Sequence, residues 1–197
     1  MGGQYMGLRS ASRAWVAPIL LAALAVSGCH RHDRHDGTKQ VAAPTTAKEG
    51  EERLVILPDS AIAARPGSTE EQLANFLASD QPPPRTFRFK GTEFQPWASK
   101  PNPPTLQTMY AIVQILRAYP KVKVTLVGYT DNDGTAEQNL ILARQRAERM
   151  ADLLIRSGIA ARRITAIGKG ATDFIADNST EAGRAKNRRI ELIVTDK

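Results

Sequence analysis

The amino-acid sequence predicts an α+β domain in which helices cover one face of a mixed sheet. From about residue 85 onward, segments with apolar residues at every second position alternate with segments whose apolar residues recur at steps of three and four. Strands and helices that alternate in this way pack as layers around one core. With 197 residues and 42% hydrophobic composition, the chain has room for one such domain plus accessory segments.

Residues 1–28 have the features of a secretory signal peptide. Arg9 and Arg13 precede an apolar stretch, Ala14–Val26, that is shorter than the roughly 20 residues of a bilayer span. Val-Ser-Gly-Cys at 26–29 resembles the bacterial lipobox, which predicts cleavage before Cys29 and attachment of diacylglyceryl and a further acyl chain, such as palmitate. Cys29 is the only cysteine, so the alternative is an ordinary buried thiol in an uncleaved N-terminal helix.

Residues 29–52 are predicted to form a flexible tether, because they are rich in charge, Thr and Ala and show no apolar period. By resemblance to sorted bacterial lipoproteins, His30 after the cysteine favours the outer membrane. His30, His32 and His35 lie near two aspartates, so a zinc or nickel site is an alternative. We favour a solvated tether, because no ordered second shell would hold such ligands, and we predict no metal and no cofactor.

An accessory strand, helix and Pro-rich link are predicted over residues 53–84. The apolar run Leu54–Leu57 indicates the strand, and Ser68 followed three positions later by Glu71 resembles the capping box of a helix. The three prolines at 82–84 predict an extended connection. So short a region can hardly form its own core, and we expect it to pack on the main domain.

The main domain, residues 85–197, is predicted to contain four strands and two long helices. The strands are expected at Phe87–Phe89, Lys121–Tyr129, Arg163–Ile167 and Ile190–Val194. The helices are expected at Thr105–Tyr119 and from Ala136 to beyond Leu154, with a third, short helix at Thr180–Lys186. The apolar stripe of the second helix is predicted to be Ala136, Leu140, Ala143, Ala147, Met150 and Leu154.

The most informative polar residues follow the 121–129 strand. Asp131 stands at the strand end, and Thr135 with Gln138 forms a capping pair for the next helix. At roughly 100° per residue, Asn139 and Arg146 project along one edge of that helix's apolar stripe and can reach a surface groove. A carboxylate and a guanidinium held apart by a fold can bind the ammonium and carboxylate of a zwitterion.

Three ordered motifs carry a family resemblance. They are Gly128-Tyr-Thr-Asp131, Asn139-x-x-Leu-Ala-x-x-Arg146-Ala147 and Gly183-Arg-x-x-Asn-Arg-Arg189. Together they resemble the OmpA-like peptidoglycan-binding domain of OmpA C-termini, peptidoglycan-associated lipoproteins and flagellar stator proteins, over the chain from about Thr86 to the C-terminus. The resemblance implies a βαβαββ sandwich with a mixed four-stranded sheet.

The resemblance also implies a function and a set of contact residues. The implied ligand is the free end of meso-diaminopimelate in the peptidoglycan stem peptide, with Asp131 and Arg146 as main contacts and Thr130, Asn139 and Arg189 beside them. The implied protein is not an enzyme. It is a lipoprotein of the cell outer membrane whose domain faces the periplasm and anchors that membrane to the cell wall.

The sequence departs from the family pattern at a few positions. Tyr129 replaces the usual histidine and Ala143 the usual serine, which removes neither principal charge. The loop from Phe89 to Trp97 lacks the family's Asp/Asn-Ser pattern, so no ligand residue is carried over there. Trp97 either lines the groove or is an ordinary packed surface aromatic.

Alternative readings of the charged residues remain open at this point. Asp131 and Arg146 would also suit an internal salt bridge. Arg188 and Arg189 would suit a solvated charge run, and we choose Arg189 because it matches the final motif. The run Asp131–Gly134 is read as a turn, because its glycine comes too early for a calcium loop.

Composition and charge narrow the classes of function. The formal net charge of +7 falls to about +5 once residues 1–28 are removed, and no basic run is interleaved with aromatics, so nucleic acid is not an expected partner. No histidine or cysteine occurs after residue 35, which excludes a Ser-His triad or a His-rich zinc site there and leaves a carboxylate-pair glycosidase as the one hydrolase reading. A further alternative is an adaptor or regulatory lipoprotein that binds an envelope protein through residues 53–84.

Overall fold

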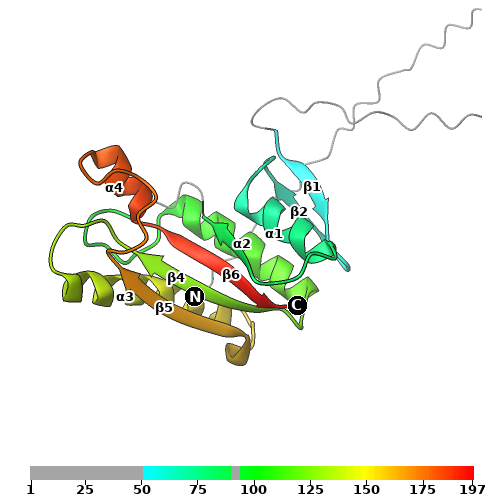
Figure 1. Cartoon of the computed structure of the whole chain (residues 1–197). Helices are drawn as coiled ribbons and strands as arrows, with labels where there is room; N and C mark the ends of the chain where they lie inside the picture. Colours follow the sequence, from blue (N-terminus) through cyan, green and yellow to red (C-terminus); the bar gives the residue numbers. More distant parts are fainter. Residues whose placement is uncertain (1–50, 90–93) are drawn as a thin grey trace, which may run out of the picture. The chain divides into compact units, whose positions relative to one another are not determined.

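A four-stranded mixed sheet forms one layer of the fold in the computed structural model, which describes residues 51–89 and 94–197 (Figure 1). Its strand order is β3-β6-β4-β5, with β3 (Arg85–Arg88), β6 (Ile190–Asp196), β4 (Lys123–Tyr129) and β5 (Ile164–Gly170). The β3–β6 and β6–β4 pairs are antiparallel and the β4–β5 pair is parallel. The predicted α+β class with a mixed sheet is therefore confirmed.

The predictions for the signal peptide and for the tether up to residue 50, including Cys29 and the three histidines, lie outside the described residues. Within residues 51–89 and 94–197, no helix is long and apolar enough to cross a membrane.

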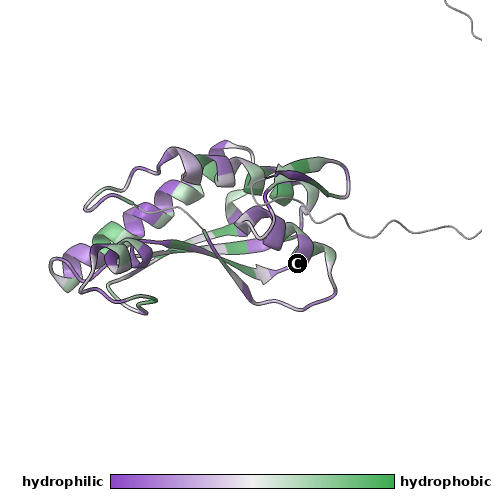
Figure 2. Cartoon of the chain, turned by 90° about the horizontal axis from the view of Figure 1, so that it is seen from above, coloured by the Kyte–Doolittle hydropathy of each residue, from purple (hydrophilic) through white to green (hydrophobic). Residues whose placement is uncertain are grey.

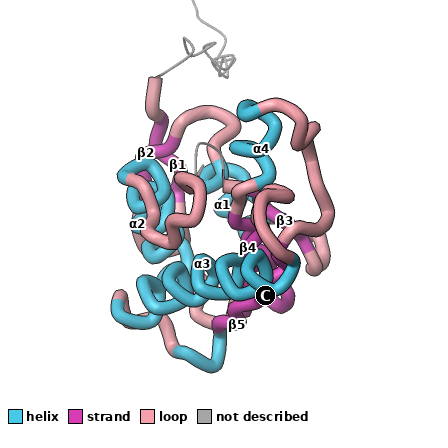
Figure 3. The backbone as a smooth tube through the Cα atoms, turned by 90° about the vertical axis from the view of Figure 1, so that its left-hand side faces the viewer, coloured by secondary structure: helices cyan, strands magenta, loops and turns pink. Residues whose placement is uncertain are grey.

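Helices α2 (Pro103–Ala118) and α3 (Ala136–Arg156) contribute their apolar sides to the core that covers one face of the sheet. The side chain of Asn102 caps α2 by accepting a hydrogen bond from Thr105 N at 2.9 Å, and the two prolines at its start explain why it begins before the predicted Thr105. Thr135 and Gln138 form the predicted capping box of α3. Helix α3 runs beside β4 and β5 (Figure 3).

Two shorter helical segments complete the main domain. The 3-10 turn η1 (Ala161–Arg163) precedes β5, and α4 (Glu181–Asn187) lies between β5 and β6. From β3 onward, the element order therefore differs from a plain βαβαββ sequence by the short turn η1 and by α4, the helix predicted at 180–186.

The core lies between the sheet and the helices. It contains Val124 and Leu126 of β4 and Ile190, Leu192 and Val194 of β6, together with apolar residues of α2 and α3. The helices in Figure 2 carry both hydrophobic and hydrophilic stretches, as expected of elements that bury one side only.

A glycine brings α3 unusually close to the sheet at the end of β4. A Cβ placed on Gly128 would lie 2.1 Å from the carbonyl oxygen of Ala143, so any larger residue would force strand and helix apart. This close approach positions the helix beside the turn that follows β4.

The buried side of α3 differs from the predicted stripe. Leu140 is 51% exposed, whereas Asn139 and Arg146 are buried beside Leu142, Ala143 and Ala147. The two polar side chains find hydrogen-bond partners inside the fold, so their polarity does not keep them at the edge of the stripe. The predicted stripe was therefore wrong at Ala136 and Leu140, which are exposed, whereas Asn139 and Arg146 are buried next to it.

The accessory region contains two strands, not one. Strands β1 (Arg53–Ile56) and β2 (Ala61–Ala64) form an antiparallel pair, followed by α1 (Thr69–Ala78). The second strand escaped prediction because its sequence, Ala-Ile-Ala-Ala, is poor in residues with high β-propensity.

This region joins the core of the main domain. Leu73 of α1 belongs to the same cluster of buried residues, and the rings of Phe76 and Phe87 lie 5.6 Å apart. Ser68 caps α1 as predicted, accepting a hydrogen bond from Glu71 N at 3.3 Å.

Candidate functional site

A tight turn at the end of β4 positions the predicted carboxylate. Oδ1 of Asp131 accepts a hydrogen bond from Asp133 N at 3.3 Å, which closes an Asx turn, and Gly134 provides a positive φ of 84°. Nδ2 of Asn139, on the first turn of α3, donates to the carbonyl of Asp133 at 2.7 Å. Asp131 is therefore held close to the start of α3.

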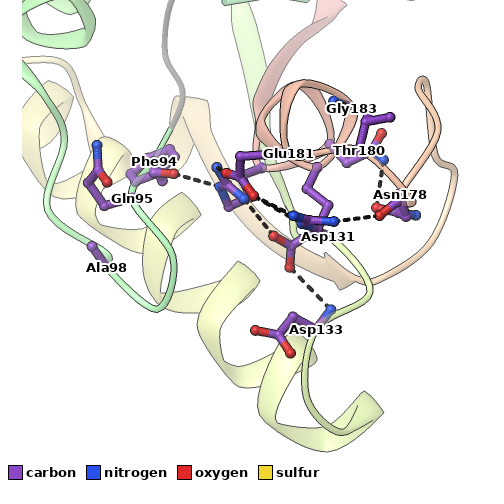
Figure 4. A network of polar contacts seen from close by, with 12 residues as sticks. Phe94, Gln95, Ala98, Asp131, Asp133, Asn178, Thr180, Glu181 and Gly183 are labelled. Carbon is purple, nitrogen blue, oxygen red and sulfur yellow. Dashed lines mark hydrogen bonds and ion pairs between the residues drawn. The ribbon is translucent and has the colours of Figure 1, made fainter.

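Arg188 pairs with Asp131 at the centre of the site. Its Nη1 lies 2.8 Å from Asp131 Oδ2, and the two side chains are 6% and 10% exposed. Its Nη2 lies 2.7 Å from Glu181 Oε1, and its Nε donates to the carbonyl of Phe94 at 2.8 Å (Figure 4). Burial lowers the pKa of Arg188, but the hydrogen bonds to Asp131 and Glu181 outweigh it, so the net shift is upward.

Arg146 is fully buried, and its hydrogen-bond partners among the described residues are all neutral carbonyls. Its Nε donates to the carbonyl of Ala98 at 2.8 Å, Nη2 to that of Gln95 at 3.2 Å and Nη1 to that of Tyr129 at 3.3 Å. Its guanidinium also lies 4.6 Å from the ring centroid of Phe94. No ion pair to Arg146 forms within the described residues, so the alternative of an internal Asp131–Arg146 salt bridge does not describe this structure.

Burial lowers the pKa of Arg146 to about 10, with Asp131 raising it and Arg188 lowering it. The guanidinium therefore remains charged at neutral pH. A buried charge without a counter-charge in contact is unfavourable for folding, which makes a functional reason for its position plausible on physical grounds.

Arg189 lies on the other face of the sheet from the helices. Its guanidinium stacks 3.7 Å from the ring centroid of Tyr129, and its Nε lies 2.9 Å from Glu191 Oε1, which Arg88 also contacts. The choice of Arg189 as the residue beside the ligand is corrected here, because the structure brings Arg188, and not Arg189, to Asp131.

The sequence contained a signal for this difference. Ile190, Leu192 and Val194 alternate toward the core, and two residues that precede such a strand point to opposite faces. If this alternation is continued toward the N-terminus, Arg188 lies on the face of the sheet that the helices cover, and Arg189 lies on the opposite face.

The contacts of Arg189 and Glu191 also include the side chain of Tyr129. Burial is the main cause that raises the pKa of Tyr129, and the charge of Glu191 adds to it. The aromatic ring found here in place of a histidine thus packs against Arg189, away from Arg146.

Thr130 connects the end of β4 to the end of β5. Its backbone N–H donates to Gly170 O at 3.0 Å, and its hydroxyl is buried with no hydrogen-bond partner among the described residues.

The space among the site residues is very small. A cavity of about 10 Å³ is lined by Pro96, Trp97, Asp131, Asp133, Asn139, Leu142, Arg146 and Arg188. The structure therefore brings together three of the five predicted contact residues, Asp131, Asn139 and Arg146, and adds Arg188 and the Trp97 segment. Residues 51–89 and 94–197 contain no group of His, Cys, Asp and Glu able to hold a metal ion.

The structure is thus an α+β domain in which helices cover one face of a mixed sheet and a charged site lies at a strand-to-helix turn. The sequence model described as "OmpA family" matches residues 94–188, which contain every residue that lines the cavity. This part of the chain is therefore a domain of the OmpA family.

Several curated proteins are similar in sequence. The probable lipoprotein YiaD of Escherichia coli (strain K12) is 40% identical over 94 residues, which cover 48% of this chain and 43% of that protein. The peptidoglycan-binding protein ArfA of Mycobacterium tuberculosis (strain ATCC 25618 / H37Rv) is 41% identical over 47% of this chain and 28% of its own length. The outer-membrane lipoprotein YfiB of Pseudomonas aeruginosa is 40% identical over 47% of this chain and 55% of its own length. The chain thus spans less than two thirds of each of these relatives.

Solved structures share the fold. The cell wall anchor of the T6SS from Pseudomonas aeruginosa aligns with a TM-score of 0.50 and 27% identity, covering 66% of this chain and 97% of that one. The peptidoglycan-associated lipoprotein from Burkholderia pseudomallei aligns with a TM-score of 0.50 and 27% identity, covering 55% and 88%.

Proposed function

We propose that this protein binds peptidoglycan non-covalently and anchors the outer membrane to the cell wall, without catalysing a reaction. The observation that carries the proposal is Arg146, a fully buried guanidinium that contacts no carboxylate of residues 51–89 or 94–197 and lies in one cavity with Asp131. The similarity to ArfA, a peptidoglycan-binding protein, and to YfiB, an outer-membrane lipoprotein, supports it.

The ligand we propose is the free end of meso-diaminopimelate in the stem peptide. That end carries one ammonium and one carboxylate on the same carbon. Asp131 is the acceptor for the ammonium, and Arg146 is the bidentate donor for the carboxylate. Asn139 lines the same cavity, Thr130 is the neighbour of Asp131 in the sequence, and Arg188 is proposed here in place of Arg189.

The binding energy of one stem peptide is modest. Two charge-assisted contacts of about 1.5–3 kcal/mol each give weak affinity once the costs of association are subtracted. A polymeric ligand and a protein held at a membrane raise the effective concentration, so many weak contacts suffice. In this proposal the membrane anchor is the lipid on Cys29, and the domain faces the periplasm.

Co-sedimentation with purified sacculi of the meso-diaminopimelate type tests the proposal. We expect the full chain in mild detergent to sediment with sacculi, and the Asp131→Asn and Arg146→Met variants to lose at least tenfold in affinity. The matched control is Arg144→Met on the same helix, because Arg144 is 71% exposed and pairs with Glu148. Binding that is unchanged in both site variants, with circular dichroism like that of the wild type, would refute the assigned site.

A second candidate function is that of an envelope adaptor, and it rests on the accessory strands. Leu54 and Ile56 on β1 are 72% and 73% exposed, which is unusual for large aliphatic side chains on one face of a strand. Such a face would suit a protein partner bound through residues 53–84. Replacing both residues by serine should abolish site-specific cross-linking from this strand to an envelope protein while sacculus binding persists; an unchanged cross-link would count against the adaptor role.

A further inference from the structure

We propose that the segment Phe94–Ala98 closes the ligand site and that Trp97 sets how often the site opens. This inference rests on the proposed function, because it concerns access to the same Asp131–Arg146 site. Three independent features of the segment support it.

The first feature is that backbone carbonyls of the segment accept hydrogen bonds from the guanidinium groups of Arg146 and Arg188. Ala98 O and Gln95 O accept from Arg146 at 2.8 and 3.2 Å, and Phe94 O accepts from Arg188 at 2.8 Å. Phe94, Gln95 and Ala98 are labelled around the network in Figure 4. Neutral carbonyls thus stand where the oxygens of a carboxylate ligand would have to lie. A carboxylate forms stronger hydrogen bonds to a guanidinium than a neutral carbonyl does, so exchange of one for the other is favourable.

The second feature is the lack of space. The cavity between Asp131 and Arg146 has about 10 Å³, which is at the lower limit for one water molecule. An amino-acid centre with its ammonium and carboxylate is several times larger. The ligand therefore cannot reach Arg146 unless part of the wall moves.

The third feature identifies which part of the wall moves. Trp97 has a φ of 58°, in the left-handed region that a bulky residue adopts at an energetic cost, and its side chain is half-exposed. Its ring rests on the turn that carries Asp131: a Cβ on Gly134 would lie 2.2 Å from the ring carbon Cη2. Asn139 and Arg146, by contrast, lie on the regular helix α3. The strained segment is the wall that can yield.

The affinity measured for the ligand then depends on the fraction of molecules in which the segment is open. If only that fraction binds, the apparent dissociation constant is the intrinsic one divided by the open fraction. The Trp97 ring stabilises the closed state through its contact with the turn. Its removal raises the open fraction and tightens binding, although no contact to the ligand has been added.

The first test compares Trp97→Ala with the wild type in the full chain, by titration with meso-diaminopimelate-type sacculi. We expect Trp97→Ala to bind three- to tenfold more tightly. Tyr110→Ala is the matched control, because Tyr110 is also an exposed aromatic residue, 59% exposed, but lies on α2 away from the cavity, and it should leave binding unchanged.

The outcomes separate the inference from the function. Wild-type binding that Trp97→Ala leaves unchanged or weakens would overturn closure by the segment and leave the binding function intact. Failure of both proteins to bind, with native circular dichroism, would overturn the function and the inference together. Binding by Trp97→Ala alone would support both.

A second test follows the ring itself. Trp15→Phe leaves Trp97 as the only tryptophan of the chain, so its fluorescence reports on the segment. The probe is a soluble stem tripeptide that ends in meso-diaminopimelate. We expect acrylamide to quench Trp97 more strongly once the tripeptide saturates the site, and stronger protection of the ring on binding would refute the opening.

Discussion

Asp131 and Arg188, 57 positions apart in the sequence, form a buried ion pair of 2.8 Å beside the fully buried guanidinium of Arg146. One carboxylate thus lies near two cations, of which it contacts only one. Arg188 also pairs with Glu181, so among the described residues Arg146 is the guanidinium of the site that has no carboxylate in contact. The pair also ties the turn after β4 to the C-terminal end of α4, where Arg188 is the capping residue.

The two arginines of the site should contribute differently to stability. Arg188→Met removes the partner of a buried carboxylate, and breaking a buried pair in this way costs about 3–5 kcal/mol. Arg146→Met removes a charge whose partners are only carbonyls, so we expect a loss smaller by roughly 2 kcal/mol. Urea unfolding followed by circular dichroism measures both, and equal losses would contradict the unequal pairing seen in the structure.

Arg189 should matter for folding but not for the ligand. Arg189→Ala removes the stack on Tyr129 and one of the two arginines that contact Glu191, for which we expect a loss of about 1–3 kcal/mol in the free energy of unfolding. Because Arg189 lies on the other face of the sheet, its removal should change sacculus affinity less than twofold. A tenfold loss of binding in this variant would instead support the role that the sequence analysis assigned to it.

Gly128 should be intolerant of any side chain. In Gly128→Ala the added Cβ would lie 2.1 Å from the carbonyl of Ala143, so β4 and α3 must separate at the site. Overpacking of this kind typically costs about 1–3 kcal/mol, and we expect weaker sacculus binding as well. Gly158→Ala is a useful comparison, since its Cβ would meet no atom within 4 Å but its φ of 90° strains any side chain, so it should lower stability while leaving binding unchanged.

The stability of the domain should fall at alkaline pH in part because of Tyr129. Its pKa is raised in the folded state from 10.0, chiefly by burial, so the folded protein resists loss of the phenol proton. The stabilisation from this group is fully present below pH 10 and is lost as the pH rises through the folded pKa. Unfolding free energies measured between pH 8 and about 11.5 should decline less in Tyr129→Phe than in the wild type; identical slopes would contradict this assignment.

Much of the fold could be predicted because its signals are local. The alternation in β4 and β6, the Thr135 cap of α3 and the Ser68 cap of α1 all depend on residues close together in the sequence. Strand β2 was missed because four residues of weak propensity form a strand only where β1 pairs with them. Leu140 was misplaced because apolarity alone cannot show that Asn139 and Arg146 find partners inside the fold.

The candidate site, like the fold, was predictable where its signals are local and not where distant segments meet. The residue types and their order sufficed to indicate a carboxylate and a guanidinium at a strand-to-helix turn. The partner of each charge was not predictable, because Arg146 contacts the carbonyls of Gln95 and Ala98, 51 and 48 positions away, and backbone carbonyls have no sequence signature.

The sequence by itself thus determined the order of strands and helices in the main domain, the caps of α1 and α3 and the chemistry of the candidate site, since each of these depends on short-range periodicity and residue type. Only the tertiary structure decided that Asp131 pairs with Arg188, that Arg189 lies across the sheet, and that the segment Phe94–Ala98 covers Arg146. These three contacts depend on which distant segments of the chain meet in the fold. The packing of the whole core and the need to provide every buried donor with an acceptor decide which segments meet.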